Sequence, residues 1–152
     1  MNLSFTLNGT RTALQARSFE RLIDVLKEQC ALDSISDGCR KGECGACLVL
    51  LDGDLVHSCL IPAFRIHGRQ IQTVEGLKRD RLFADISASL AGSLCEFCSS
   101  AVLLTVYHTL SRTTRPTPYQ IEQALSCITC HCAGLPSTLD AVIELSRSRR
   151  SR

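Results

Sequence analysis

Cysteine is the residue type in this chain most able to do chemistry, because ten cysteines occur among 152 residues. Four of them follow the spacing C-x4-C-x2-C, with the fourth cysteine after a further eleven residues. These four are Cys39, Cys44, Cys47 and Cys59. This is the plant-type spacing of a [2Fe–2S] cluster, whereas a structural zinc site favours two C-x2-C pairs. The segment is therefore predicted to bind a [2Fe–2S] cluster.

Small residues accompany these cysteines, and they suit the same purpose. They are Gly38, Gly42, Gly45 and Ala46. Without bulky side chains, the backbone can curl around a cluster and direct its N–H groups at the sulfur atoms. Such hydrogen bonds stabilise the negative charge of a cluster and help to set its reduction potential.

A second cysteine group begins with the C-x2-C pair of Cys95 and Cys98 and continues in "CITCHC", which contains Cys127, Cys130 and Cys132. A four-thiolate site needs only two of the last three. Cys130 and Cys132 follow the expected end of a helix, and in extended chain residues i and i+2 face the same side. Geometry therefore favours these two, with Cys127 and Cys130 as the rival pairing. A second [2Fe–2S] cluster is expected, and zinc is the alternative metal.

The elements that position the first group are predicted to be β-rich. "LSFTLNG" alternates apolar and polar residues and ends in Asn8-Gly9, a hairpin signal, with "RTALQAR" as the returning strand. A second hairpin turns at Asp52-Gly53, and residues 69–77 are expected to form a further short strand. This arrangement, with a helix after the first hairpin, predicts a plant-ferredoxin-like β-grasp domain over residues 1–77.

The helix expected after the first hairpin covers residues 18–30, where apolar residues recur at helical spacing. Its apolar face is predicted to contain Phe19, Leu22, Ile23, Leu26 and Cys30.

The second half is predicted to be helical. The expected helices cover residues 81–92, 100–112, 117–126 and 136–148. Thr117, Pro118 and Gln120 form a strong N-terminal signal, with a capping side chain, an early proline and a capping box. These elements predict a four-helix bundle domain over residues 78–152, so the fold class is α+β with two domains.

Composition excludes several classes of protein. The net charge is only +2, and four of the 17 basic residues lie in the Arg-rich tail "SRSRRSR", so the body of the chain has no signature of nucleic-acid binding. No apolar run approaches the roughly 18 residues of a membrane span, and the N-terminus lacks the layout of a signal peptide. A cytoplasmic protein is expected, in which ten cysteines indicate metal binding rather than disulfides.

The two cysteine groups, in this order, resemble the small iron–sulfur subunit of molybdenum hydroxylases, a family that includes xanthine dehydrogenases, aldehyde oxidoreductases and carbon monoxide dehydrogenases. The segments "GCRKGECGACLVLLDG", "SCLIPA" and "IQTVEGL" carry the likeness in the first half. "PTPYQIEQALS" and "CHCAGLPSTLDAV" carry it in the second half, so that it covers nearly the whole chain.

The resemblance implies two sets of cluster ligands. They are Cys39, Cys44, Cys47 and Cys59 in the ferredoxin-like domain, and Cys95, Cys98, Cys130 and Cys132 in the helical domain. It also implies a large molybdopterin-binding partner subunit, and an FAD-binding subunit as the usual acceptor. Electrons would pass from molybdopterin through the helical-domain cluster and the ferredoxin-like cluster, and this chain would perform no substrate chemistry itself.

Two other functions are compatible with the residues. One is a ferredoxin-type carrier for a different flavoprotein, and the other is an assembly module whose helical half holds zinc or no metal. The sequence departs from the family pattern at Leu94, where the family has a glutamine that contacts the pterin, at Cys127, where it has glycine, and at His131, where it has arginine.

Overall fold

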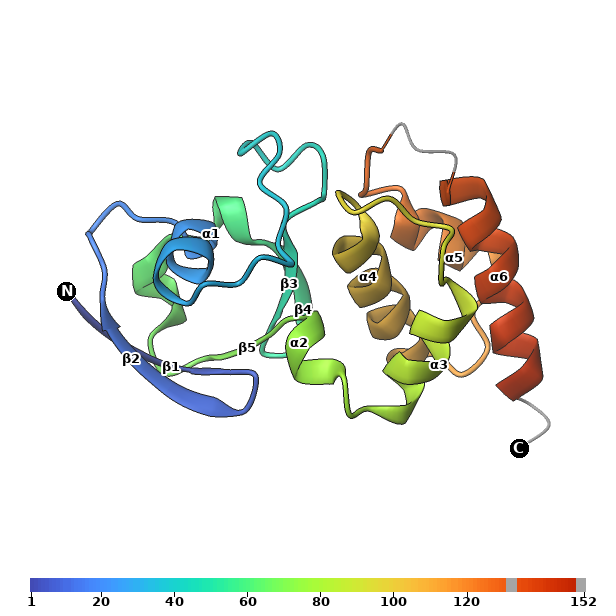
Figure 1. The fold of residues 1–152 in the computed structure, drawn as a ribbon, viewed down its shortest axis with the longest axis horizontal. Helices are drawn as coiled ribbons and strands as arrows, with labels where there is room; N and C mark the ends of the chain where they lie inside the picture. The colour runs from blue at the N-terminus through green and yellow to red at the C-terminus, as the bar shows by residue number, and fades with distance from the viewer. Residues whose placement is uncertain (131–133, 150–152) are drawn as a thin grey trace.

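The computed structural model describes residues 1–130 and 134–149, and it has the expected α+β organisation (Figure 1). The N-terminal half contains a mixed five-stranded sheet with the strand order β2-β1-β5-β3-β4. Its strands are β1 (Asn2–Leu7), β2 (Thr10–Gln15), β3 (Leu48–Leu51), β4 (Asp54–His57) and β5 (Gln70–Gln72). Its short helices are α1 (Leu22–Asp24), η1 (Val25–Gln29), η2 (Ser58–Leu60), η3 (Ala63–Ile66) and α2 (Val74–Leu77).

Both predicted hairpins are present. β1 pairs with β2 and β3 pairs with β4, each in antiparallel register. The two turns have left-handed backbone at both central residues, with φ of 51° and 83° at Asn8-Gly9 and 52° and 87° at Asp52-Gly53. This geometry suits the twist of a tight hairpin, and it explains why Asn-Gly and Asp-Gly were reliable signals. The strand expected over residues 69–77 is shorter, because the chain turns into α2 after β5.

The prediction of a helix over residues 18–30 was wrong at its start. The helix begins at Leu22, and the Phe19 side chain, expected on its apolar face, is 97% exposed. The Glu20 carboxylate accepts the Arg17 N–H at 2.8 Å and the Glu20 N–H donates to the Arg17 carbonyl at 3.1 Å, so a turn occupies the predicted first residues. The remaining apolar residues, Leu22, Ile23 and Leu26, are fully buried as expected.

The C-terminal half contains α3 (Arg81–Ser89), α4 (Ser99–Arg112), α5 (Pro118–Leu125) and α6 (Gly134–Ser148). The signal at the start of α5 is confirmed, because the Thr117 hydroxyl accepts the Gln120 N–H at 3.2 Å and the Gln120 side chain accepts the Thr117 N–H at 2.8 Å. α4 packs against α3 and α5, and α6 packs against α3 and α5 (Figure 1).

β3 is shared between the two halves. All four of its residues are buried, and alternate side chains face opposite sides of a strand. Val49 and Leu51 belong to the core around α1, whereas Leu48 packs with α4 and Leu50 packs with Phe83 and Leu104. Figure 1 shows β3 between α1 and α4. The helical half is therefore packed onto the sheet.

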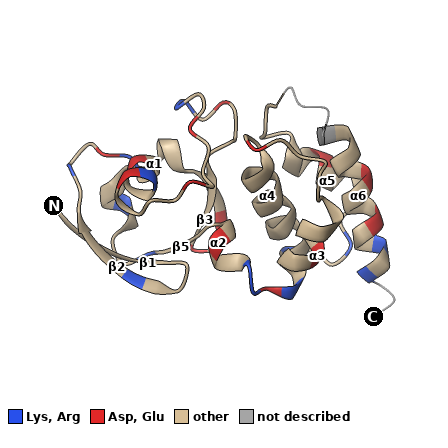
Figure 2. Cartoon of the chain, viewed as in Figure 1, with Lys and Arg blue, Asp and Glu red and all other residues tan. Residues whose placement is uncertain are grey.

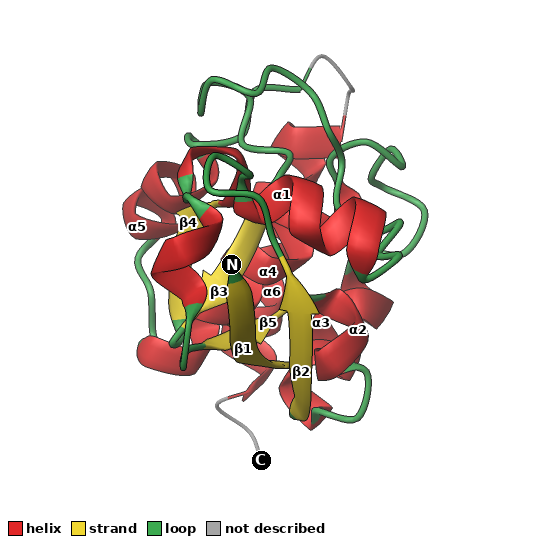
Figure 3. Ribbon diagram, turned by 90° about the vertical axis from the view of Figure 1, so that its left-hand side faces the viewer, coloured by secondary structure: helices red, strands yellow, loops and turns green. Residues whose placement is uncertain are grey.

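Charges of both signs are spread over both halves (Figure 2). In the described residues, no helix combines the length and apolar character needed to cross a bilayer. The loop before β3, the loop before α4 and the segment after α5 lie at one edge of the molecule, at the top of the views (Figures 1 and 3). These segments contain Cys39, Cys44, Cys95 and Cys130.

Candidate metal centre

The first cysteine group is assembled by a loop and a hairpin. Cys39 and Cys44 lie in the loop before β3, and Cys47 immediately precedes that strand. The antiparallel register of β3 and β4 pairs Leu48 with His57, which brings Ser58 and then Cys59 back beside Cys47. The Ser58 hydroxyl and N–H both donate to the Cys47 carbonyl, at 2.7 and 3.2 Å. The structure thus brings Cys59 back to the loop, as the spacing predicted.

The loop directs backbone N–H groups at the Cys39 sulfur. The amides of Lys41, Glu43 and Cys44 lie 3.3, 3.2 and 3.3 Å from Cys39 Sγ. These donors lower the pKa of the Cys39 thiol from 9.0 to about 6, because a hydrogen bond to sulfur favours the thiolate. The loop is therefore already arranged around an anionic sulfur.

Cys59 has the opposite electrostatic surroundings. Its side chain is buried, as is that of Cys47, and burial together with the neighbouring Cys47 raises the pKa of Cys59 to about 11. A buried thiolate needs a nearby positive charge, and ferric iron supplies one when it is coordinated by sulfur. The donor set, in which Cys39 and Cys44 are half-buried and Cys47 and Cys59 are buried, fits a thiolate-bound metal cluster.

Three glycines confirm that the loop is too tight for side chains. A Cβ atom at Gly42 would lie 2.5 Å from Leu60 Cδ1, and one at Gly38 would lie 2.8 Å from Cys44 Sγ. A Cβ atom at Gly45 would lie 2.1 Å from the Cys127 carbonyl oxygen. Gly42 and Gly45 also have positive φ, at 77° and 71°, which favours glycine.

The second group lies at one end of the helical half. Cys95 is in the loop before α4, Cys98 is the N-cap residue of α4, and Cys130 follows α5. Cys95 Sγ lies 3.4 Å from Cys98 Sγ and 3.5 Å from Cys130 Sγ, and the three sulfur atoms all lie within 4.8 Å of one another. Cys132, like His131, lies outside the described residues. Three of the four predicted ligands are therefore together.

Cys127 is placed differently from Cys130. Its thiol donates to the Ala124 carbonyl at 3.1 Å, and burial raises its pKa. It is not a member of the cysteine group that the described residues form. The structure therefore disfavours the rival pairing of Cys127 with Cys130. Cys130 lies with Cys95 and Cys98, whereas the Cys127 thiol is directed back to α5.

The two cysteine groups lie beside each other. The Thr129 N–H donates to the Cys44 carbonyl at 2.9 Å, and Thr129 directly precedes Cys130. Gly45 abuts the Cys127 backbone, and a Cβ atom at Gly38 would lie 2.8 Å from the Phe97 ring. A single hydrogen bond and short stretches of covalent chain therefore connect Cys44 to Cys130.

Sequence reasoning did not identify Phe97 or Thr129 as connecting residues. The only available signal was the position of each one, because Phe97 lies inside the C-x2-C pair and Thr129 lies beside a predicted ligand. Leu94, at the family's glutamine position, is partly buried and packs on the helical core.

Comparisons with known proteins agree with both centres. Residues 5–75 match the family model of a 2Fe-2S iron-sulfur cluster binding domain, and residues 73–143 match that of a [2Fe-2S] binding domain. The chain is 31% identical to the nicotinate dehydrogenase small FeS subunit of Eubacterium barkeri, across 88% of this chain and 87% of that protein.

Solved structures give the same result for the fold. Quinoline 2-oxidoreductase from Pseudomonas putida superposes with a TM-score of 0.88 and 29% identity, over 99% of this chain and 96% of that chain. The aldehyde oxidoreductase of Desulfovibrio desulfuricans superposes with a TM-score of 0.87 and 26% identity, over 99% of this chain and 17% of that one. With both domain matches, the tandem cysteine groups and this likeness, the chain belongs to the small [2Fe–2S] iron–sulfur subunits of the molybdenum hydroxylase family.

Proposed function

We propose that this chain is the electron-transfer subunit of a molybdenum hydroxylase complex. The observation that carries the proposal is the contact between the two cysteine groups, in which the Thr129 N–H donates to the Cys44 carbonyl at 2.9 Å. A pair of metal centres joined in this way suits the passage of single electrons, whereas two unrelated structural metal sites would not need to meet.

The proposed ligands form two sets. The first cluster is held by Cys39, Cys44, Cys47 and Cys59, and the second by Cys95, Cys98, Cys130 and Cys132. The described thiols support seven of these eight assignments by their positions, and the spacing of "CHC" supports Cys132. When bound, each cluster accepts and releases one electron. The protein supplies the sulfur ligands, the N–H donors around Cys39 and the burial of Cys47 and Cys59.

The proposed organisation has two domains. Residues 1–77 form the ferredoxin-like β-grasp domain, and residues 78–152 form the four-helix bundle domain with its basic C-terminal tail. The two matched segments meet near this boundary, at residues 73–75.

The proposed partners are a large molybdopterin-binding subunit as the electron source and an FAD-binding subunit as the acceptor. Relatives named as small subunits support a multi-subunit assembly. A cytoplasmic site of action is part of the proposal, because cysteines that serve as cluster ligands must stay reduced.

Purification of the native complex tests the proposal. Metal and sulfide analysis should give about four irons per small subunit and no zinc, together with molybdenum in the complex, and EPR of the reduced sample should show two distinct [2Fe–2S] signals. Two irons with one zinc would instead support the assembly-module alternative. Two clusters without a molybdopterin-binding partner would support a ferredoxin-type carrier for another flavoprotein.

A further inference from the structure

The residue after Cys39 has an unfavourable backbone conformation. Arg40 has φ of 55°, in the left-handed region that residues with a Cβ atom rarely adopt. Such a torsion persists only when the surrounding structure enforces it. The contacts that Arg40 makes are therefore informative about what this loop is built to do.

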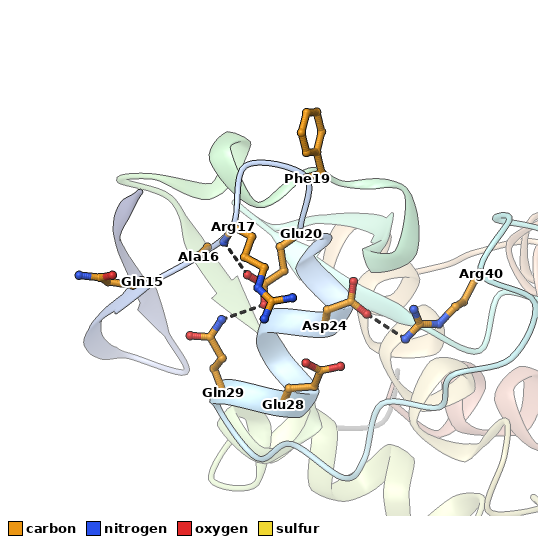
Figure 4. Close-up of a pocket in the computed structure, with 9 residues that line it drawn as sticks. All are labelled: Gln15, Ala16, Arg17, Phe19, Glu20, Asp24, Glu28, Gln29 and Arg40. Carbon is orange, nitrogen blue, oxygen red and sulfur yellow. Dashed lines mark hydrogen bonds and ion pairs between the residues drawn. The ribbon is translucent and has the colours of Figure 1, made fainter.

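Three side chains from two segments hold Arg40 in place. Its Nε lies 2.9 Å from each carboxylate oxygen of Asp37, and its Nη2 lies 2.8 Å from Oδ1 of Asp24. Nη1 of Arg21 donates to the Arg40 carbonyl at 2.7 Å, and the other Asp24 oxygen accepts the Arg21 N–H at 3.3 Å. Figure 4 shows the Arg40 side chain reaching from the cysteine loop to Asp24 on α1. We call Arg21, Asp24, Asp37 and Arg40 the Arg40 clamp.

The Arg40 clamp acts on the segment that supplies the N–H donors. The amides of Lys41, Glu43 and Cys44, which donate to Cys39 Sγ at 3.2 to 3.3 Å, all follow Arg40 directly in the chain. The Arg40 torsion determines the direction in which this segment leaves Cys39. A change to the usual negative φ would turn the amides away from the sulfur.

We propose that the Arg40 clamp is a positioning device that sets the reduction potential of the first cluster, by holding three N–H donors on the Cys39 sulfur. This inference rests on the proposed function, in which Cys39 is a ligand of that cluster. Reduction adds one electron, delivered from the second centre, and so adds one negative charge. N–H donors stabilise the reduced form more than the oxidised form, and they raise the potential.

For two variants, a direct effect of charge would shift the reduction potential in the opposite direction from the effect of losing the clamp. Replacement of Asp24 or Asp37 by asparagine removes a negative charge near the cluster, so electrostatics alone would raise the potential. Loss of the clamp would release the N–H donors from the Cys39 sulfur and so lower the potential. Arg40→Lys keeps the positive charge but lacks the planar fork that contacts two carboxylates, so it lowers the potential only if positioning matters.

The experiment is an EPR-monitored redox titration of the intact complex with Asp24→Asn, Asp37→Asn and Arg40→Lys. The signal of the second cluster serves as an internal reference in each sample. Asp54→Asn is the matched control, because Asp54 forms another surface ion pair, with Arg112 at 2.5 Å, and lies at the far end of β4 from Cys59. The expected result is a lower potential of the first cluster in all three clamp variants and no shift in the control.

Other outcomes distinguish the positioning role of the Arg40 clamp from the proposed electron-transfer function. A raised or unchanged potential in both aspartate variants overturns the positioning role and leaves the electron-transfer function intact. Loss of the first signal in Asp24→Asn overturns it in favour of a purely structural role. Absence of the first signal from the unsubstituted complex overturns the proposed function itself.

Discussion

The Thr129 amide donates a hydrogen bond to the Cys44 carbonyl at 2.9 Å, and this bond joins the loop of the ferredoxin-like half to the segment after α5. Thr129 is next to one proposed ligand and Cys44 is another, so this hydrogen bond and a short stretch of chain connect the two sets of ligands. Thr129 makes a second contact with the same loop, because its Oγ1 donates to the Glu43 carbonyl at 3.5 Å.

Removal of the Thr129 N–H should weaken this junction. Thr129→Pro lacks the donor, and we expect a loss of about 1 kcal/mol in the free energy of unfolding and slower electron exchange between the clusters. Denaturant titration and rapid-freeze EPR measure the two effects. Thr129→Ala is the control, because it keeps the N–H and removes only the hydroxyl. Equal behaviour of the two variants would show that the amide is unimportant.

Gly45 should tolerate no side chain. Gly45→Ala combines a φ of 71° with a Cβ atom 2.1 Å from the Cys127 carbonyl oxygen, so strain and overpacking add. We expect a loss of about 2–4 kcal/mol, against about 1 kcal/mol for Gly53→Ala. Gly53 has φ of 87° but nothing within 4 Å of its would-be Cβ atom, so it isolates the cost of the torsion. Similar losses at both sites, measured by chemical denaturation, would contradict the close approach of the two loops.

The three cysteines of "CITCHC" should differ in their importance. Cys127→Ala should keep both clusters, because its thiol is bonded to the Ala124 carbonyl and lies outside the cysteine group. Cys130→Ala and Cys132→Ala should each lose the second cluster, with iron falling from about four to about two per chain. Iron analysis and EPR check this. Loss of the second signal in Cys127→Ala would favour the rival pairing of Cys127 with Cys130.

Stability should depend on His108 between pH 7 and 5. Burial and the neighbouring Arg112 lower the pKa of His108 below its ordinary value of 6.5, and Asp54 opposes this only in part. The unfolded chain therefore binds a proton at a higher pH than the folded chain does. Stability from this residue is present above pH 6.5 and is lost as the pH falls below it.

Thermal unfolding at a series of pH values measures this dependence. His108→Gln should flatten the fall in melting temperature between pH 7 and 5, because the substituted side chain does not titrate. His67→Gln is the control, since this histidine is exposed, accepts a hydrogen bond from the Ser4 N–H at 3.3 Å and has no ion-pair partner among the described residues. An unaltered slope in His108→Gln would overturn the prediction.

Local chemistry explains which elements could be predicted from the sequence. Asn8-Gly9 and Asp52-Gly53 adopt left-handed torsions that few other residues favour, and Thr117 caps α5 with its hydroxyl next to Pro118; all three were placed correctly. Phe19 was misplaced because its periodicity with Leu22 is compatible with a helix, whereas the turn at Arg17 and Glu20 depends on a carboxylate contact.

The cysteine spacing was informative because most ligands of each group occur in short local motifs, such as Cys39 to Cys47 and the pair of Cys95 and Cys98. The contacts between the groups were not predictable. Gly38 meets Phe97, and Cys44 meets Thr129, across long separations in sequence, and these pairs arise only when the helical half packs on β3. No local pattern encodes that packing.

The double burial of β3 has a mechanical consequence. A linker between two domains would let the separation of the centres fluctuate, and the rate of electron tunnelling would fluctuate with it. Here Leu48 and Leu50 pack in two clusters with the helices, and Val49 and Leu51 pack in the core around α1, so neither side can open without exposing the same strand. The two halves should therefore melt as one cooperative unit. The strand acts as a rigid spacer that keeps the tunnelling distance constant.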